Sequence, residues 1–319
     1  MATSEQIKSL IRSHYSSEPE RFTTIALQLA AHEAKQGHTA LAHDIRSIVD
    51  NSKPAKTKFI QFNSELADQV ISSTPRERLS DLFLPEDIHL RIERILREYH
   101  QQEKLKKHGL SNRRKILLAG PPGTGKTMTA AVLAGELHLH LHTILMDKMI
   151  TKFMGETSAK LRLIFDIIQK TRGIYLFDEF DAIGAQRGRD NEVGEMRRVL
   201  NSFLQFIEQD NSDSLIVAAT NNPQILDQAL YRRFDDVLYY HLPTDEEIKQ
   251  LIINRLGNFR KKTVSLDSSV REAKKLSHAE ITQACNDAIK ETILADKDTV
   301  TIKLLNKMLH ERRLAYKII

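Results

Sequence analysis

The segment GPPGTGKT, residues 120–127, has the residue types and spacing of a loop that binds phosphate groups. Gly123 and Gly125 let the backbone come close to the phosphates, and Lys126 can reach the β- and γ-phosphates of a nucleotide. The Thr127 hydroxyl is placed to bind Mg²⁺. The sequence therefore predicts a site for ATP and Mg²⁺, whose nucleotide-binding residues are Gly120, Pro121, Pro122, Gly123, Thr124, Gly125, Lys126, Thr127 and Met128.

Two adjacent carboxylates are the second set of candidate groups. Asp178 and Glu179 follow the apolar run 174–177, which predicts a buried strand. In a parallel sheet, ligands bind at the carboxyl ends of the strands. We expect Asp178 to hold Mg²⁺ through its water shell and Glu179 to polarise the water that attacks the γ-phosphorus. An acidic turn without a ligand is the alternative, and the upstream loop argues against it.

The elements that must position these residues alternate along the chain. From residue 85 onward, apolar strands alternate with helices, which predicts a parallel sheet covered by helices on both faces. The phosphate-binding loop lies between a predicted strand at 116–119 and a predicted helix at 128–137. In this setting, the backbone N–H groups of the loop and the helix N-terminus converge on one anionic point. An ordinary glycine turn is therefore disfavoured.

Three regions differ in their pattern. Residues 1–75 carry short amphipathic stripes, one of them behind Pro19, and are predicted to form a helical N-terminal domain that binds a partner. Residues 76–243 are predicted to form the α/β nucleotide-binding domain. Residues 244–319 have helical periodicity and are predicted to form a helical lid. The first boundary is expected within 51–80, where polar, Pro-containing segments indicate a linker.

Three segments together resemble the AAA branch of the AAA+ ATPases, which are P-loop NTPases. They are GPPGTGKT as the Walker A motif, IYLFDEFDAIGAQR as the Walker B motif, and LIVAATNNPQILDQALYRRFD as the second region of homology. The resemblance covers the chain from about residue 80 onward. It implies an α/β P-loop NTPase module with a C-terminal helical lid, here preceded by a small all-α domain. It also implies an ATP-dependent ring, usually a hexamer.

This resemblance assigns roles to further residues. Asn221 occupies the sensor-1 position, where an amide can hydrogen-bond the γ-phosphate and the attacking water. Arg232 and Arg233 match the arginine fingers that reach the ATP of the neighbouring subunit. Family members commonly have two further residues between these arginines, so the motif does not decide which of the two is the essential finger. The alternative role for the pair is a contact with the dipole at the C-terminus of a helix. The predicted catalytic residues are Glu179, Asn221, Arg232, Arg233 and Lys126.

The segment LSHAEITQACNDAIK, residues 276–290, resembles the lid helix that begins Ser-Gly-Ala-Asp in the family. Here His278, Ala279 and Glu280 replace the last three of those residues. The segment has no arginine as a sensor 2, which agrees with the AAA branch and argues against the clamp-loader and initiator branches. Cys285 is predicted to be a small buried apolar residue.

The segment KFMGE, residues 152–156, resembles the loop that lines the central pore of protein-translocating AAA machines. Phe153, Met154 and Gly155 are the predicted substrate pore loop, because a rigid aromatic ring beside a flexible apolar side chain can grip any extended polypeptide. A packed loop is the alternative. Residues 187–194 have the position of a second pore loop, although their charges equally suit exposure to solvent.

The composition limits the location and the partners. Hydrophobic residues are 41% and charged residues 28%, which excludes collagen-like, low-complexity and wholly disordered chains. No apolar run approaches the roughly 20 residues of a membrane span. The chain opens without a signal-peptide pattern, and its one cysteine permits no internal disulfide. These features predict a cytoplasmic protein that does not bind membranes.

Two other ligand classes are disfavoured. The net charge of +5 permits binding of nucleic acid, but the basic stretch 104–115 has no interleaved aromatic residues for base stacking. A solvated helix face and loop are therefore favoured over a nucleic-acid surface. His138, His140 and His142 alternate as on one strand face, but no carboxylate or cysteine completes a metal site at ligand spacing.

The resulting prediction is a ring-forming AAA ATPase that unfolds, threads or remodels a protein partner, which residues 1–75 select. The alternatives are a nucleotide-controlled interaction switch, or regulator of an effector such as a protease, and a nucleic-acid-remodelling ATPase. By resemblance alone, compact stand-alone bacterial members of this type are similar to the ATPase half of pairs of an AAA ATPase and a subtilisin-like protease.

Overall fold

The computed structural model describes residues 8–9, 13, 19–36, 38, 41–45, 66, 68–150, 154–183, 190–226, 228–261 and 264–315. The chain divides into two compact units, Met1–Lys58 and Phe59–Ile319. Each unit is described by itself.

Helix α2, Pro19–Lys35, lies in the first unit. It begins at a proline, whose missing N–H suits the first turn of a helix. Ala26 and Ala30 are one turn apart and are buried on one face. The buried Glu33 lies on the same face, with its Oε2 atom 2.6 Å from Nδ1 of His38. A helix is therefore present where the stripe behind Pro19 predicts one.

The described strands of the second unit form one six-stranded sheet in the order β1-β3-β4-β5-β2-β6. Strands β2 to β6 run parallel to one another, and the edge strand β1 pairs antiparallel with β3. This mostly parallel sheet confirms the predicted α/β fold. The strands are β1 (Val70–Ser73), β2 (Lys115–Ala119), β3 (Leu141–Leu145), β4 (Ile174–Asp178), β5 (Leu215–Thr220) and β6 (Asp236–Tyr239).

Strand β1 differs from the prediction, which places residues 1–75 in an all-helical domain. Val70 is buried opposite Ile144 of β3, and Ser72 Oγ lies 2.8 Å from Nδ1 of His142. The strand is only the four residues VISS, too short for an alternating pattern to distinguish it from a loop. Its place at the edge of the sheet depends on contacts with β3, which are distant in the sequence.

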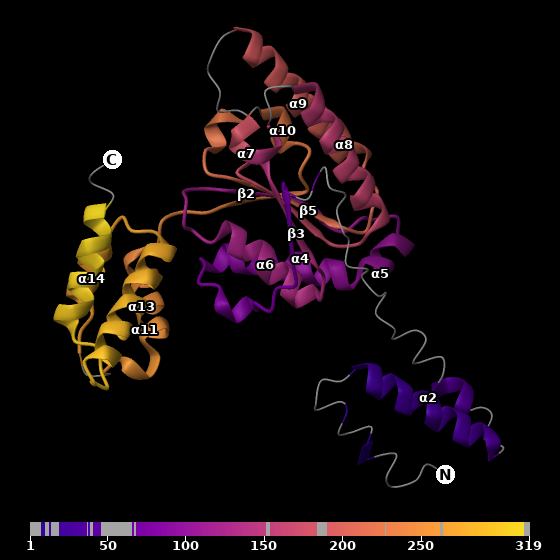
Figure 1. Ribbon diagram of the computed structural model, residues 1–319, viewed down its shortest axis with the longest axis horizontal. Helices are drawn as coiled ribbons and strands as arrows, with labels where there is room; N and C mark the ends of the chain where they lie inside the picture. The colour runs from indigo at the N-terminus through magenta and orange to yellow at the C-terminus, as the bar shows by residue number, and fades with distance from the viewer. Residues whose placement is uncertain are drawn as a thin grey trace. The chain divides into compact units, whose positions relative to one another are not determined.

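The central strands are apolar on both faces because helices cover both. Along β4, Ile174 and Leu176 pack in one core cluster, whereas Tyr175 and Phe177 pack in the other. Helices α4 (Glu86–His100) and α6 (Lys126–Leu137) contribute to the first cluster. Helices α8 (Met154–Lys170) and α9 (Asp190–Gln209) contribute to the second. Figure 1 shows α4 and α6 on one side of the sheet and α8 and α9 on the other.

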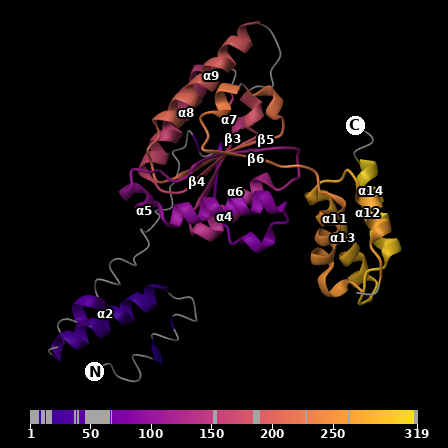
Figure 2. The same ribbon diagram turned by 180° about the vertical axis from the view of Figure 1, so that it is seen from behind.

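The C-terminal helices pack around a core of their own, which includes Ile252, Ile281, Cys285 and Leu305. Cys285 is fully buried there, as predicted. Figure 2 shows these helices gathered together beyond β6. They are α11 (Asp245–Leu256), α12 (Asp267–Ala273), α13 (His278–Leu294) and α14 (Ile302–Ala315).

Short helical segments connect these elements. They are α5 (Gln102–Lys107), α7 (Met146–Met149), α10 (Gln228–Tyr231), η1 (Leu79–Asp81), η2 (Phe180–Ile183), η3 (Pro223–Ile225) and η4 (Gly257–Phe259). Among the residues that the structure describes, no helix is both long enough and apolar enough to cross a lipid bilayer.

Candidate active site

The loop at 120–127 joins the carboxyl end of β2 to the first turn of α6. Gly123 and Gly125 have φ angles of +71° and +103°, in the left-handed region that glycine adopts without a steric penalty. The Oγ1 atom of Thr124 donates a hydrogen bond to the carbonyl of Pro121 at 2.8 Å, which closes the loop. The sequence thus folds here into the strand, turn and helix that phosphate binding requires.

Lys126 is the cation of the site. Its side chain is buried, and its Nζ atom donates to the carbonyls of Gly120 and Pro121, both at 2.7 Å. Burial lowers the pKa of Lys126 to about 8, against the opposing effect of the nearby Asp178 and Asp181 carboxylates. The ammonium group is therefore held at the loop by backbone carbonyls and acidic neighbours.

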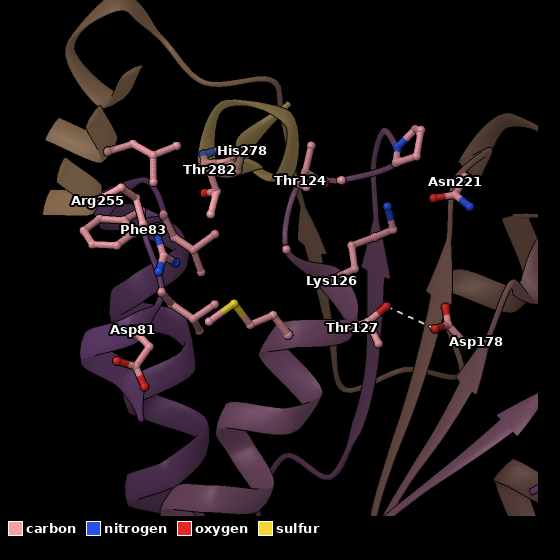
Figure 3. Close-up of a pocket in the computed structure, with 18 of the residues that line it drawn as sticks. Asp81, Phe83, Thr124, Lys126, Thr127, Asp178, Asn221, Arg255, His278 and Thr282 are labelled. Carbon is pink, nitrogen blue, oxygen red and sulfur yellow. Dashed lines mark hydrogen bonds between the residues drawn. The ribbon is translucent and has the colours of Figure 1, made fainter. Parts of the chain in front are cut away.

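Thr127 and Asp178 lie together although 51 residues separate them in the sequence. The Thr127 hydroxyl, in the first turn of α6, donates to Oδ2 of Asp178 at 3.0 Å (Figure 3). Asp178 is the last residue of β4, so the two oxygens meet at the carboxyl edge of the sheet. Hydroxyl and carboxylate oxygens are ligands that Mg²⁺ prefers, and the residues present therefore fit this ion.

Glu179 follows β4 directly and has a φ angle of +53°. Non-glycine residues rarely adopt this conformation, which costs about 1–2 kcal/mol. The N–H group of Glu179 donates to Oδ1 of Asp178 at 2.9 Å. Burial raises the pKa of the Glu179 carboxyl, and the carboxylates of Asp147, Asp178 and Asp181 raise it further. Glu179 is exposed to solvent, and its strained backbone and acidic neighbours distinguish it from an isolated surface glutamate.

Asn221 follows the carboxyl end of β5, and its N–H group donates to Oδ1 of Asp181 at 3.0 Å. The same Asp181 oxygen accepts a hydrogen bond from the Thr220 hydroxyl at 3.1 Å. Asp181 therefore fixes the start of the segment after β5 relative to the turn after β4. The sequence analysis did not identify this residue. The available signal was a third acidic residue within DEFD, close to the two carboxylates that it did identify.

A pocket of about 530 Å³ in the second unit is lined by Lys126, Thr127, Asp178, Glu179 and Asn221. In Figure 3, Asp178 and Asn221 lie at one end of the pocket, with Lys126 and Thr127 in the middle. Phe83, Arg255, His278 and Thr282 line the opposite end. The guanidinium group of Arg255 lies over the ring of Phe83, 5.7 Å from its centroid. Charged and polar side chains therefore lie at both ends of the pocket, and Gly123, Thr124, Gly125, Met128 and Glu179 also line it.

The start of helix α13 contacts the loop. The N–H group of Ala279 donates to the carbonyl of Gly123 at 3.0 Å. A Cβ atom on Gly123 would lie 2.5 Å from Oγ of Ser277, which shows how closely the side chains at the start of α13 approach the loop. Ser277 caps α13, since its hydroxyl accepts the N–H group of Glu280. This contact between the loop and α13 was not apparent in the sequence.

Arg232 and Arg233 are both exposed and do not line the pocket. Arg233 forms an ion pair with Glu208 near the end of α9. Among the described residues, no ion pair includes Arg232. The structure thus distinguishes two residues that the sequence leaves equivalent.

The predicted pore loop lies mostly beyond the described part of the chain. Phe153 is outside the described residues. Met154 and Gly155 form the start of α8, and their side chains are not described. The predicted roles of these three residues remain predictions.

One of the alternating histidines, His142, packs against neighbouring strands of the sheet. His142 is buried against the ring of Tyr175, with a centroid distance of 4.9 Å, and lies beside Ser72 of β1. Burial lowers the pKa of His142 to about 4. The described residues contain no group of three or more His, Cys, Asp or Glu side chains arranged to hold a metal ion.

Comparison with known proteins places the chain in a family. Residues 116–242 match the family model described as ATPase family associated with various cellular activities (AAA). A protein of Sinorhizobium fredii named as an uncharacterized AAA family ATPase, y4kL, is 31% identical over 98% of this chain and 96% of its own length. The chain therefore belongs to the AAA family of ATPases, as the motifs predicted.

Two further relatives share parts of the chain. A protein of Methanothermobacter thermautotrophicus, named as a 26S proteasome regulatory subunit homolog, is 30% identical over 63% of this chain and 56% of its own length. The peroxisomal ATPase pex6 of Schizosaccharomyces pombe is 33% identical over 58% of this chain and 21% of its own length. The chain thus spans only part of these two relatives.

Proposed function

We propose that the protein binds ATP with Mg²⁺ in the pocket at 120–127 and hydrolyses the bond between the β- and γ-phosphates. One observation carries this proposal. The ammonium group of Lys126, the hydroxyl of Thr127, the carboxyl groups of Asp178 and Glu179, and the amide of Asn221 come from the ends of three adjacent strands to one pocket. Membership of the AAA family and the names of its relatives support the same activity.

In the proposed reaction, water attacks the γ-phosphorus in line with the bond that breaks, and ADP and phosphate are the products. Glu179 orients this water and accepts its proton. Lys126 offsets the charge on the β- and γ-phosphates, and the Asn221 amide hydrogen-bonds the γ-phosphate and the water. Thr127 and Asp178 would hold Mg²⁺, which supplies further charge neutralisation when bound.

Arg232 is proposed to be the finger that completes the site of a neighbouring subunit. It is exposed, whereas the guanidinium group of Arg233 is already paired with Glu208 in its own subunit. A charged guanidinium group that reaches the transferred phosphate from another subunit contributes about 10³–10⁵ in rate. Arg233 is then proposed to hold the segment after α10 against α9.

We further propose that the subunits assemble as a ring, by resemblance a hexamer, and use ATP to unfold, thread or remodel a protein partner. The names of the relatives support this proposal, since one is a proteasome regulatory subunit homolog and another is a peroxisomal ATPase. Residues 1–75 are proposed to select the partner, and Phe153, Met154 and Gly155 to grip it. The proposed location is the cytoplasm.

The Glu179→Gln variant tests the ATPase proposal. This substitution keeps the size of the side chain and removes its ability to accept a proton. ATP affinity should stay within about threefold of the parent, and the rate of hydrolysis should fall by at least about 100-fold. Glu103→Gln is the control, because Glu103 is exposed on α5. Hydrolysis by Glu179→Gln at the parental rate would refute the assigned base.

A further inference from the structure

Tyr240, the residue after β6, is a buried polar residue that the mechanism above does not use. Its backbone N–H group donates to the carbonyl of Ala119 at 2.7 Å, and its hydroxyl oxygen lies 2.7 Å from Oγ1 of Thr129. Ala119 ends β2, directly before the phosphate-binding loop, whereas Thr129 lies in the first turn of α6, directly after it. Tyr240 therefore contacts the chain on both sides of the loop.

The start of the loop also packs directly against Tyr240. A Cβ atom on Gly120 would overlap the carbonyl oxygen of Tyr240 and would lie 2.8 Å from its Cβ atom. Only glycine allows two backbone segments to approach so closely. The segment after β6 therefore lies against the first residue of the loop, and the side chain of Tyr240 extends from there to the first turn of α6.

The hydroxyl groups of Tyr240 and Thr129 form a chain that ends at the carbonyl of Gly125. Oγ1 of Thr129 donates to this carbonyl oxygen at 3.0 Å. A carbonyl oxygen can only accept, so the one hydroxyl proton of Thr129 is used there, and the Tyr240 hydroxyl donates to Oγ1. Burial raises the pKa of Tyr240, which keeps its proton in place. Both residues are buried, so water does not compete for either bond.

This chain of hydroxyl groups acts on the peptide group that joins Gly125 to Lys126. The C=O of Gly125 and the N–H of Lys126 point in opposite directions, because the peptide is planar and trans. The Gly125 carbonyl is held toward Thr129 by the hydroxyl and by the N–H group of that residue. The N–H of Lys126 consequently points out of the N-terminus of α6, the direction in which a helix binds phosphate.

We infer that Tyr240 and Thr129 are positioning residues for phosphate binding. Their hydroxyl groups fix the first peptide group of α6, and the backbone bond from Tyr240 to Ala119 fixes the other end of the loop. Neither side chain lines the pocket, so both act through the backbone of the loop. The inference rests on the proposed ATP site and assigns part of its phosphate affinity to a buried contact with the segment after β6.

The test uses ADP and inorganic pyrophosphate, each titrated calorimetrically into the full chain. Tyr240→Phe should weaken the binding of both ligands by about fivefold, the effect of one buried hydrogen bond. The KM for ATP should rise by about the same factor, with kcat within about twofold of the parent, because the loop holds the phosphates before and during the reaction.

Tyr175→Phe is the matched control for Tyr240→Phe. Tyr175 is also fully buried, and its hydroxyl donates to the carbonyl of Thr171 at 2.9 Å, near the start of β4. This variant loses one buried hydroxyl bond in the same unit without touching the phosphate-binding loop. It should bind ADP and pyrophosphate as the parent does.

Variants of Thr129 separate binding from folding. Thr129→Val keeps the shape of the side chain but should weaken both ligands by at least about tenfold, and its unfolding temperature without ligand should fall, because the Tyr240 hydroxyl loses its partner. The double variant Thr129→Val with Tyr240→Phe removes that unpaired hydroxyl. It should therefore unfold at a higher temperature than Thr129→Val and yet bind no more tightly. Thr129→Ser keeps the hydroxyl and should bind within about threefold of the parent.

The outcomes that contradict the inference differ from those that contradict the ATP site. Parental affinity in Tyr240→Phe, or equal losses in Tyr240→Phe and Tyr175→Phe, would overturn the inference. Affinity that recovers with the unfolding temperature in the double variant would also overturn it, because the hydroxyl groups would then act only through stability. Failure of the parent itself to bind either ligand would instead contradict the proposed ATP site.

Discussion

At the scale of single residues, the backbone and the side chain of Asn221 have different roles, one structural and one chemical. Its backbone N–H group holds Asp181, while its exposed side chain faces the pocket. Asn221→Ala keeps the backbone bond and removes only the amide. We expect kcat to fall about 100-fold, as for other lost hydrogen bonds to a transition state, with ATP affinity within about threefold of the parent.

Asn222→Ala is the control for this prediction, because Asn222 is adjacent and also exposed. Its kcat should match that of the parent in a steady-state assay of phosphate release. If Asn221→Ala weakened ATP binding without slowing turnover, the amide would contact the ground state instead of the transition state.

At the scale of elements, the approach of α13 to the phosphate-binding loop depends on Gly123. Gly123→Ala adds a Cβ atom 2.5 Å from Ser277 Oγ, in addition to the strain of an alanine at a φ angle of +71°. The first turn of α13 must then move, and the bond from Ala279 to Gly123 is lost. We expect ADP affinity to fall at least about tenfold.

Gly109→Ala provides the matched control. Gly109 has a φ angle of +73°, and no atom of the described residues lies within 4 Å of the position of its added Cβ atom. The Gly109→Ala variant therefore has the conformational cost of an alanine at positive φ, about 1–2 kcal/mol, without a steric clash. Calorimetry should show parental ADP affinity for this variant, and equal affinity losses in both variants would refute the proposed role of close approach.

The sequence predicted the elements whose signals are local. Strands such as 116–119 and 174–177 are continuous apolar runs, and they are buried on both faces in the structure. The loop between β2 and α6 carries its own steric signature in its glycines. The residues that meet at the pocket were predictable because parallel strands bring their carboxyl ends to one edge.

Contacts between distant segments were not predictable from local patterns. Asp181 accepts bonds from the end of β5, and Ala279 donates to the loop, but neither residue type has a sequence signal for these partners. Strand β1 was not predictable for the same reason, because its four residues form a strand only through their pairing with β3. Such contacts depend on tertiary packing, which overrides weak local preferences.

At the scale of the whole molecule, a buried ion pair joins the start of β2 to the segment before β5. Arg114 contacts both the carboxylate and the backbone carbonyl of Asp210, which is fully buried. Arg114→Met would leave this carboxylate buried without its cationic partner, with only the hydrogen bonds from Ser212. The free energy of unfolding should fall by about 3–5 kcal/mol, measured by urea denaturation and circular dichroism.

The exposed pair of Lys106 and Asp213 is the comparison, with side chains 46% and 49% exposed. Lys106→Met should leave the urea midpoint unchanged within error, because solvent screens this pair. Similar losses in both variants would show that the burial of Asp210 does not determine the stability of this region.

The most direct test of the central claim, that an adjoining subunit completes the ATP site, mixes two inactive variants. Arg232→Ala retains Glu179 but lacks the finger, and Glu179→Gln retains Arg232 but lacks the base. Each alone should hydrolyse ATP at less than about 1% of the parental rate. In mixed assemblies, half of the sites keep Glu179, and half of those sites have a neighbour that keeps Arg232. An equimolar mixture should therefore recover about a quarter of the parental rate. A mixture no more active than its components would contradict the account.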